Sequence, residues 1–281
     1  MLAGGSESMT RAPYLLERPA AGYQRTPPRF VRPRLSPDAI GNPTMGETAE
    51  NVAQRYQVSR GDQDAFALRS HRLALQAIAD GAFRDEIVGV DVPRGRGETI
   101  CFEQDEHPRA DTSLQRLAAL PPAFRPGGSV TAGNSSGVND GAAAALLMPE
   151  RTAMQRGLEP IGRVVAWAVA GVDPKLMGMG PVPAMRKALQ LSGLRLDQIE
   201  IVELNEAFAS QALAVVRELG LEIDRVNPLG GAIALGHPIA ATGAILTAKL
   251  LHELGRRGGR YGAVTACIGG GQGIAAIFER L

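Results

Sequence analysis

The chain has 281 residues, of which 44% are hydrophobic, and a formal net charge of +1, which is enough for two compact domains or one large α/β domain. This charge balance argues against nucleic acid or a membrane surface as the main partner, and no apolar run approaches the roughly 18 residues of a membrane-spanning helix. The two cysteines are far apart, so they do not make a disulfide framework, and the first residues lack a secretory signal; a cytoplasmic protein is therefore expected.

The first half of the chain has helical periodicity in one region. Residues 1–5 predict the end of a strand, and residues 11–45, rich in Pro and Arg, predict extended loop. Residues 46–80 have the spacing of helices, and Ser59 is placed as the N-cap of the second one. Residues 86–130 predict irregular structure with short strands.

From about residue 140 the pattern changes to apolar strands that alternate with helices. Such alternation predicts a mostly parallel sheet covered by helices on both faces. We place a domain boundary near residue 150. Strands are predicted over 142–148, 162–170, 199–204, 261–267 and 273–279, and helices over 150–157, 181–191, 208–219 and 239–254.

Three segments of this second half carry residues suited to chemistry. The first is 203–209, Glu-Leu-Asn-Glu-Ala-Phe-Ala, where a predicted strand leads into a helix. The amide of Asn205 and the neighbouring carboxylate can hold a water or an oxygen atom there by hydrogen bonds. The alternative is an ordinary N-cap asparagine, and this segment alone leaves both interpretations open.

The second segment, 227–243, is a glycine-rich turn with a histidine just before a predicted helix. At that place the neutral form of His237 is favoured, and the helix amides can hold an anion or an oxyanion. The alternative is a histidine packed in a turn, but the flanking glycine and proline favour a functional role. The other histidines are expected to be at the surface or in solvated surroundings; they are His71, His107 and His252.

The third segment is an apolar strand that ends in Cys267, followed by glycines at 269, 270, 271 and 273. Glycines leave backbone N–H groups open to a ligand. A cysteine beside such donors suits acid–base work on a carbonyl substrate. The alternative is a buried structural cysteine, and that is the interpretation we give to Cys101.

These three segments, in this order, closely resemble the thiolase family. Further motifs over 4–13, 45–51, 131–141 and 178–183 extend the resemblance over essentially the whole chain. It implies an α/β fold of the duplicated, layered αβαβα kind. It also implies thiolysis of a 3-oxoacyl-CoA, as in fatty-acid β-oxidation, or the reverse Claisen condensation. Coenzyme A would be a substrate, with no bound cofactor or metal, and the protein a homodimer or tetramer.

The resemblance also implies roles for single residues. Asn205 would hold a water of the oxyanion site, and His237 would donate to the oxyanion and activate a nucleophile. Cys267 would be the general acid and base, and the Gly269 amide a donor of a second oxyanion hole. Residues matching the pantetheine and coenzyme A contacts are Ser136, Met45, Ala132, Phe124 and, at the phosphates, Arg109.

One part of the family pattern has no match in residues 1–281. The acylated cysteine of the family lies just upstream of the motif that begins here at Gly4, and neither Cys101 nor Cys267 has its context. The resemblance therefore implies residues 150–281 as the C-terminal domain and residues 1–149 as an incomplete N-terminal half, with about 10–128 as a separate cap over the substrate tunnel. The chain alone is expected to lack thiolase turnover and to expose apolar surface.

Two alternatives follow from this. The chain is either the larger part of a thiolase or a non-catalytic, coenzyme A-binding or assembly subunit that pairs with a chain supplying the rest. A smaller departure concerns Ala240, Ala241 and Thr242, which stand where the family usually has a glycine and smaller residues. They are expected to narrow the backbone approach to coenzyme A.

Overall fold

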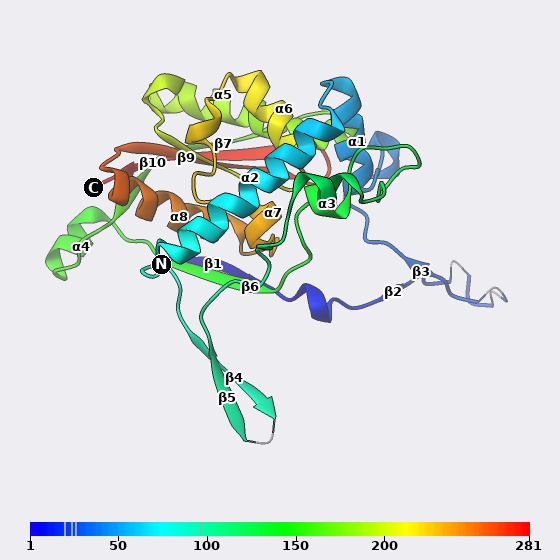
Figure 1. Ribbon diagram of the computed structural model, residues 1–281, viewed down its shortest axis with the longest axis horizontal. Coiled ribbons are helices and arrows are strands. Elements are labelled where there is room, and N and C mark those ends of the chain that lie inside the picture. Colours follow the sequence, from blue (N-terminus) through cyan, green and yellow to red (C-terminus); the bar gives the residue numbers. More distant parts are fainter. Residues whose placement is uncertain (20, 24, 26, 96) are drawn as a thin grey trace.

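The computed structural model describes residues 1–19, 21–23, 25, 27–95 and 97–281. Positions 20, 24 and 26 of the loop predicted over 11–45 lie outside the described residues. Its described part carries two short paired strands, β2 (Leu15–Leu16) and β3 (Phe30–Val31), and reaches away from the body of the molecule (Figure 1). No helix in the described ranges has the length and apolar composition needed to cross a membrane.

A four-stranded sheet forms the centre of the second half of the chain. Its strands are β8 (Ile201–Leu204), β9 (Tyr261–Ile268), β10 (Gln272–Arg280) and β7 (Gly162–Gly171), in the order β7-β10-β9-β8. Only the pair β8 and β9 is parallel, because β10 runs antiparallel to both of its neighbours. The expected mostly parallel sheet is therefore wrong.

The reason is the glycine run, which makes a hairpin instead of a crossover. Ile268 pairs with Gln272, so the residues between them form a tight turn, and Gly270 and Gly271 take φ values of +85° and +86°. Glycine adopts this left-handed backbone without steric cost. Strands joined by so short a turn are necessarily antiparallel.

Helices cover both faces of this sheet, as expected (Figure 1). On one face α5 (Pro181–Ser192) packs on β7 and β10, and its Met185 shares a core cluster with Ile277. On the other face α8 (Thr242–Arg257) places Leu250 in a second cluster with the neighbouring strand residue Phe278. Consecutive strand residues thus supply two separate apolar layers, as the pleat requires.

The helices predicted over 46–80 belong to the same core. They are α1 (Met45–Arg55) and α2 (Arg60–Ala79), and Ser59 caps α2 by accepting a 3.1 Å bond from the Asp62 amide. Both helices pack against α6 (Ala209–Leu219), and Val52 and Phe66 lie in the cluster that also holds Met185. The structure thus differs from the expected separate cap over 10–128, because α1 and α2 bury their apolar faces against the second half of the chain.

The remaining elements are short. Strands β1 (Leu2–Glu7) and β6 (Gly141–Leu146) pair antiparallel as a two-stranded sheet beside α8. The expected exposure of apolar surface is confirmed at Trp167, Val169 and Leu146, which are 62%, 45% and 65% exposed. The other short elements are the hairpin of β4 (Val90–Gly95) with β5 (Glu98–Phe102), and the helices α3 (Leu114–Ala118), α4 (Glu150–Gln155) and α7 (Ala232–Leu235).

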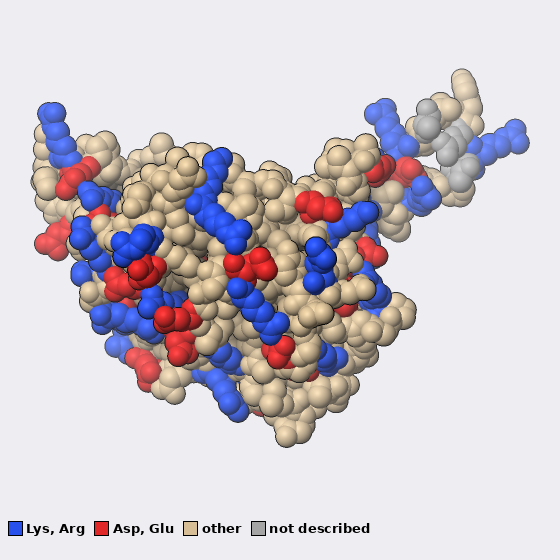
Figure 2. Space-filling view, turned by 90° about the horizontal axis from the view of Figure 1, so that it is seen from above, with Lys and Arg blue, Asp and Glu red and all other residues tan. Residues whose placement is uncertain are grey.

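Charged side chains of both signs are interspersed over the face seen in Figure 2, with basic residues gathered at the tips of the projecting arms. This distribution agrees with the net charge of +1. Such a mixed surface offers no broad field of one sign over the body of the molecule in that view.

Candidate active site

Asn205 lies directly after β8, at the carboxyl end of the parallel strand pair. Its N–H donates to Thr265 O at 2.9 Å, which extends the pairing of β8 with β9 by one residue. The N-cap of α6 is Phe208, so the alternative interpretation of Asn205 as an N-cap is excluded. Its side chain is buried, and Oδ1 has no hydrogen-bond partner among the residues that the structure describes. An unpaired buried amide oxygen is free to hold a water or a ligand.

His237 lies in the loop between α7 and α8 and does not end a strand. Its Nε2 is 3.2 Å from Asn205 Nδ2, and its Nδ1 is 2.7 Å from Thr242 Oγ1. The Thr242 hydroxyl donates its single hydrogen to Pro238 O at 3.0 Å, so it accepts from His237 Nδ1–H. In this network the lone pair of the neutral imidazole is on Nε2 and accepts from Asn205.

The surroundings of His237 keep the imidazole neutral. Burial lowers the pKa of His237 below its ordinary value, and the nearby Glu7 carboxylate opposes that effect only in part. The His237 backbone N–H donates to Asn139 Oδ1 at 3.2 Å, and the Ala240 N–H donates to Glu7 Oε2 at 3.0 Å. Motif residues of β1 and of the 131–141 segment therefore anchor the loop that carries His237.

Cys267 lies near the end of β9, two residues beyond Thr265, and pairs with Gly273. The residue is partly exposed, but its thiol is enclosed, and burial raises the pKa of Cys267 to about 12. Such a thiol stays protonated at neutral pH and can donate a proton. Asn205 and Cys267 share one end of the sheet, although in the described part of the chain no direct hydrogen bond joins the thiol to Asn205 or His237.

The glycine turn after Cys267 is held by neighbouring loops. The Gly269 carbonyl accepts from Gln272 Nε2 at 3.2 Å, and Val172 N–H donates to Gly271 O at 2.7 Å. A Cβ built at Gly269 would be 3.4 Å from the Leu35 side chain, at the base of the projecting loop. Space for a side chain thus exists at Gly269, but the following two positions are restricted to glycine by their backbone conformation.

Two of the residues matched to the pantetheine site, Phe124 and Ser136, lie next to Phe208 and its neighbour Ala207. The rings of Phe124 and Phe208 meet edge to face with centroids 5.8 Å apart. A Cβ at Gly46, next to Met45, would be 2.1 Å from the Phe124 ring, so this glycine permits the contact. Ser136 N–H donates to Ala207 O at 3.0 Å. Ala132 is exposed on a short 3-10 helix in the same segment.

Arg109 lies apart from that group, in the loop before α3. Its side chain is exposed, and its backbone N–H donates to His71 Nδ1 at 3.2 Å. His71 is only 4% exposed and stacks on His107, with ring centroids 6.4 Å apart. The expectation of a surface position is therefore wrong for His71, whereas His107 is half-buried. Helix α2 turns His71 inward, and the 105–112 loop covers it.

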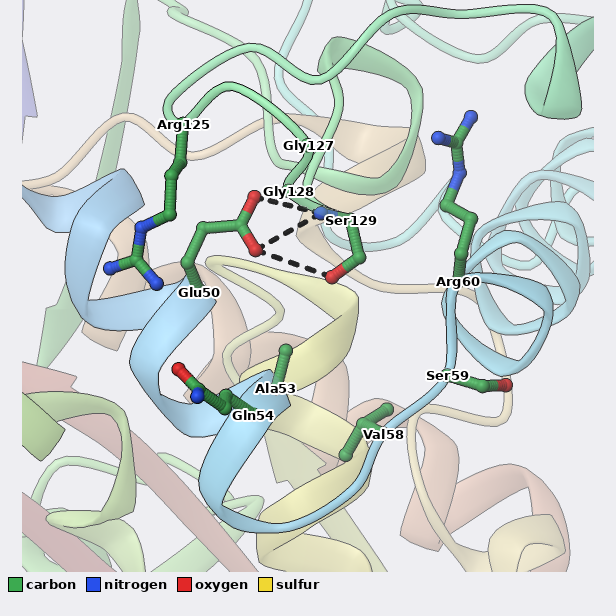
Figure 3. Close-up of a pocket in the computed structure, with 10 residues that line it drawn as sticks. All are labelled: Glu50, Ala53, Gln54, Val58, Ser59, Arg60, Arg125, Gly127, Gly128 and Ser129. Carbon is green, nitrogen blue, oxygen red and sulfur yellow. Dashed lines mark hydrogen bonds between the residues drawn. The ribbon is translucent and has the colours of Figure 1, made fainter.

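A carboxylate on α1 anchors the loop that carries Phe124. Glu50 is buried and accepts from the N–H groups of Ser129 and Val130, both at 2.9 Å, and from Ser129 Oγ (Figure 3). Beside it lies a surface pocket of about 390 Å³, lined also by Arg60 and Arg125. None of the residues predicted for the active site lines this pocket, so it is not the substrate site that the sequence predicts.

Sequence reasoning missed the residues that hold the predicted ones in place. Thr242, expected only to crowd coenzyme A, accepts from the ring of His237. Asn227 and Glu206 form a buried network behind Asn205. The sequence signal that could have marked Asn227 is its place before a Pro-Leu-Gly-Gly turn, since asparagine tolerates the left-handed backbone that it adopts here, with φ of +46°.

Comparisons with known proteins identify the family of the chain. The family model for the thiolase N-terminal domain matches residues 1–151, and that for the C-terminal domain matches residues 158–280. The beta-ketothiolase BktB of Cupriavidus necator is 51% identical over 283 residues, and an acetyl-CoA acetyltransferase of Pseudomonas aeruginosa is 49% identical. Each match covers all of this chain and 72% of the relative.

Solved structures show the same fold. The Bacillus anthracis acetyl-CoA acetyltransferase has a TM-score of 0.92 at 47% identity, and the match covers all of this chain and 71% of that one. Human mitochondrial 3-ketoacyl-CoA thiolase in complex with CoA has a TM-score of 0.91 at 42% identity and is covered over 70% of its length. These similarities show an α/β thiolase fold.

Proposed function

Because this chain belongs to the thiolase family of acyltransferase enzymes, we propose that it transfers acyl groups between coenzyme A thioesters. The reaction is thiolysis of a 3-oxoacyl-CoA or its reversal. The observation that carries this proposal is the pair Asn205 and His237, joined at 3.2 Å with Asn205 Oδ1 unpartnered, at the sheet end that also bears Cys267.

The proposed roles follow from the protonation states of the two groups. The lone pair on His237 Nε2 can take the proton of an attacking thiol, since burial holds the imidazole neutral. In thiolysis the C2–C3 bond of the substrate breaks, the acyl group moves to that thiol, and the C2 carbanion takes a proton. Cys267 would donate this proton, because its thiol is protonated at neutral pH.

We further propose that the thiol which accepts the acyl group lies outside residues 1–281. Cys101 lies in the exposed hairpin of β4 and β5, outside the sheet that bears Cys267, and burial raises the pKa of Cys267 to about 12, so neither thiol is placed as the acylated nucleophile. Ser136, Met45, Phe124, Ala132 and Arg109 would contact coenzyme A, and the Gly269 amide would face the second oxyanion. A homo-oligomer in the cytoplasm completes the proposal.

The first experiment tests the acid–base group by itself. The chain is incubated with acetyl-CoA in deuterated water, and loss of the methyl hydrogens is followed by NMR. Exchange requires a base that removes a methyl proton, so we expect it to be slow, through the small thiolate fraction of Cys267, and to fall by at least about a hundredfold in Cys267→Ala. Exchange that survives this substitution would contradict the acid–base role given to Cys267.

The second experiment separates the enzyme from the non-catalytic alternative. Thiolysis of acetoacetyl-CoA is measured for the chain and for a fusion that places the nucleophile segment of a thiolase ahead of Met1. Turnover by the fusion, with none by the chain alone, supports the proposal. Coenzyme A binding by calorimetry without exchange or turnover in either form would favour a non-catalytic subunit. Turnover by the chain itself that is lost in Cys101→Ala would overturn the placement of the nucleophile.

A further inference from the structure

We infer that Asn227 is a positioning residue whose side-chain amide sets the direction in which Asn205 enters the site. This inference rests on the proposed function for the importance of Asn205, but its structural content is independent of it. The side chain of Asn227 is completely buried, and all of its polar atoms are used. None of its contacts is to a group that would touch substrate.

Asn227 takes the place of a neighbouring strand along the free edge of β8. Val226 forms a parallel bridge with Val202, and the Asn227 N–H donates to Val202 O at 3.1 Å. Beyond that point the backbone turns away into the glycine loop. The Asn227 amide continues the pairing: Oδ1 accepts from Leu204 N–H, and Nδ2 donates to Leu204 O, both at 2.8 Å.

The second of these bonds bears directly on Asn205. The peptide group between Leu204 and Asn205 has two polar ends. Its carbonyl is held by Asn227 Nδ2 at 2.8 Å, and its N–H is held by Thr265 O at 2.9 Å. Bonds at both ends restrict rotation of this peptide plane, and they thereby hold the backbone from which the Asn205 side chain reaches His237 Nε2.

The same nitrogen connects this peptide with the loop of His237. Asn227 Nδ2 also donates to Glu206 Oε1 at 2.7 Å, and the Glu206 carboxylate accepts from Ser70 Oγ at 2.7 Å and from the Ile233 N–H of α7 at 3.2 Å. A Cβ at Gly231 would be 2.2 Å from this carboxylate, so only glycine fits there. One buried network thus spans both partners of the Asn205–His237 contact.

The test uses Asn227→Gly, which removes the amide and keeps the left-handed backbone of φ +46°. Gln57→Gly is the matched control, because Gln57 has a φ of +52° on an exposed loop. The ¹⁵N and ¹H resonances of the four histidines are titrated by NMR in the full chain. Losing the donor from Asn205 removes a bond that favours neutral imidazole, so the pKa of His237 should rise in Asn227→Gly.

His71, His107 and His252 should titrate as in the wild type, and Gln57→Gly should change none of the four. Acetyl-CoA exchange should fall roughly 10–100-fold in Asn227→Gly with coenzyme A affinity unchanged.

Asn227→Asp is the second variant. It keeps the acceptor for Leu204 N–H but loses both donated hydrogen bonds, and it should show the same rise in the pKa of His237. If the pKa of His237 in either folded variant equals that of the wild type, Asn227 does not position Asn205. If wild-type exchange is absent while the titrations behave as expected, the proposed function fails and this inference stands.

Discussion

At the residue scale the candidate site is defined by two groups whose surroundings hold them in opposite protonation states. Burial lowers the pKa of His237, so its imidazole is a free base, and burial raises the pKa of Cys267 to about 12, so its thiol is a proton donor. Desolvation acts in both cases, because it always disfavours the charged form. A base and an acid are thereby available at the same pH.

The pH dependence of thiolysis by the fusion protein should reflect these two groups. Activity needs neutral His237, so it should persist as the pH falls below 6.5, the ordinary histidine value, and decline only through the lowered pKa. It also needs protonated Cys267, so no loss is expected near pH 9, where an ordinary thiol ionises. The kcat/KM profile measures both limbs. An acid limb centred at or above 6.5 would contradict the neutral, buried imidazole.

Thr242 gives a second prediction at this scale. Thr242→Val keeps the shape but removes the oxygen that accepts from His237 Nδ1–H, which leaves a buried donor unpaired. We expect kcat to fall roughly fivefold to tenfold with little change in KM for coenzyme A. Thr242→Ser keeps the hydroxyl and should retain most of the activity. Equal loss in both variants would show that the methyl group, not the hydrogen bond, matters.

At the scale of elements, one buried ammonium group ties the strand, the glycine loop and the helix of the site together. Lys249 of α8 donates to Glu203 Oε2 at 3.0 Å on β8 and to Gly230 O at 2.6 Å in the loop before α7. Both charged side chains are almost fully buried. Removing one partner of such a pair is costly because it leaves the other charge buried and unpaired.

Lys249→Met should therefore destabilise the chain by about 3–5 kcal/mol, measured by urea unfolding at pH 7. The stranded Glu203 carboxyl would be favoured in its protonated form, since burial already raises its pKa. The loss should thus shrink as the pH falls. The double variant Lys249→Met, Glu203→Leu removes both charges and should recover most of the stability. Additive losses in the double variant would show that the two side chains are not coupled.

At the scale of the whole molecule, α2 joins the two halves of the chain. It packs on α6 and α7, and its His71 accepts the Arg109 N–H from the loop before α3. Burial, assisted by the neighbouring His107 and Arg109, lowers the pKa of His71 to about 4. The helix that joins the halves therefore carries a buried histidine that resists protonation.

This histidine should make stability depend on pH. The folded chain binds a proton at His71 only near pH 4, whereas the unfolded chain binds it near 6.5. The contribution of neutral His71 is therefore complete above 6.5 and is lost as the pH falls from 6.5 to 4, by about 1–3 kcal/mol. His71→Asn keeps an acceptor for Arg109 N–H and does not titrate. The free energy of unfolding of the wild type is compared with that of His71→Asn at each pH, and the difference isolates the contribution of His71. Glu86, whose pKa is raised to about 7, contributes in the opposite direction, but it does so equally in both proteins. A difference that does not change between pH 7 and pH 4.5 would contradict the buried, neutral state.

The sequence alone was enough to locate the helices around 46–80, the strands β7, β9 and β10, and the segments that carry Asn205, His237 and Cys267. These features follow from local periodicity, from the capping side chain of Ser59 and from glycine-rich turns, which are properties of neighbouring residues. The family resemblance came from the same segments and is confirmed by both family models.

Only the tertiary structure decided how these segments meet. Strand direction depends on which edges pair, and the Gly269–Gly271 turn folds β10 back antiparallel where alternation had suggested a parallel sheet. Burial depends on what another element covers, so His71 is enclosed although its helix neighbours are charged. The hydrogen bonds between the Asn227 side chain and the Leu204 backbone join residues 23 positions apart. Local sequence determines backbone preference, but hydrogen-bond partners of buried groups are chosen by contacts between distant segments, and these hold the candidate site in place.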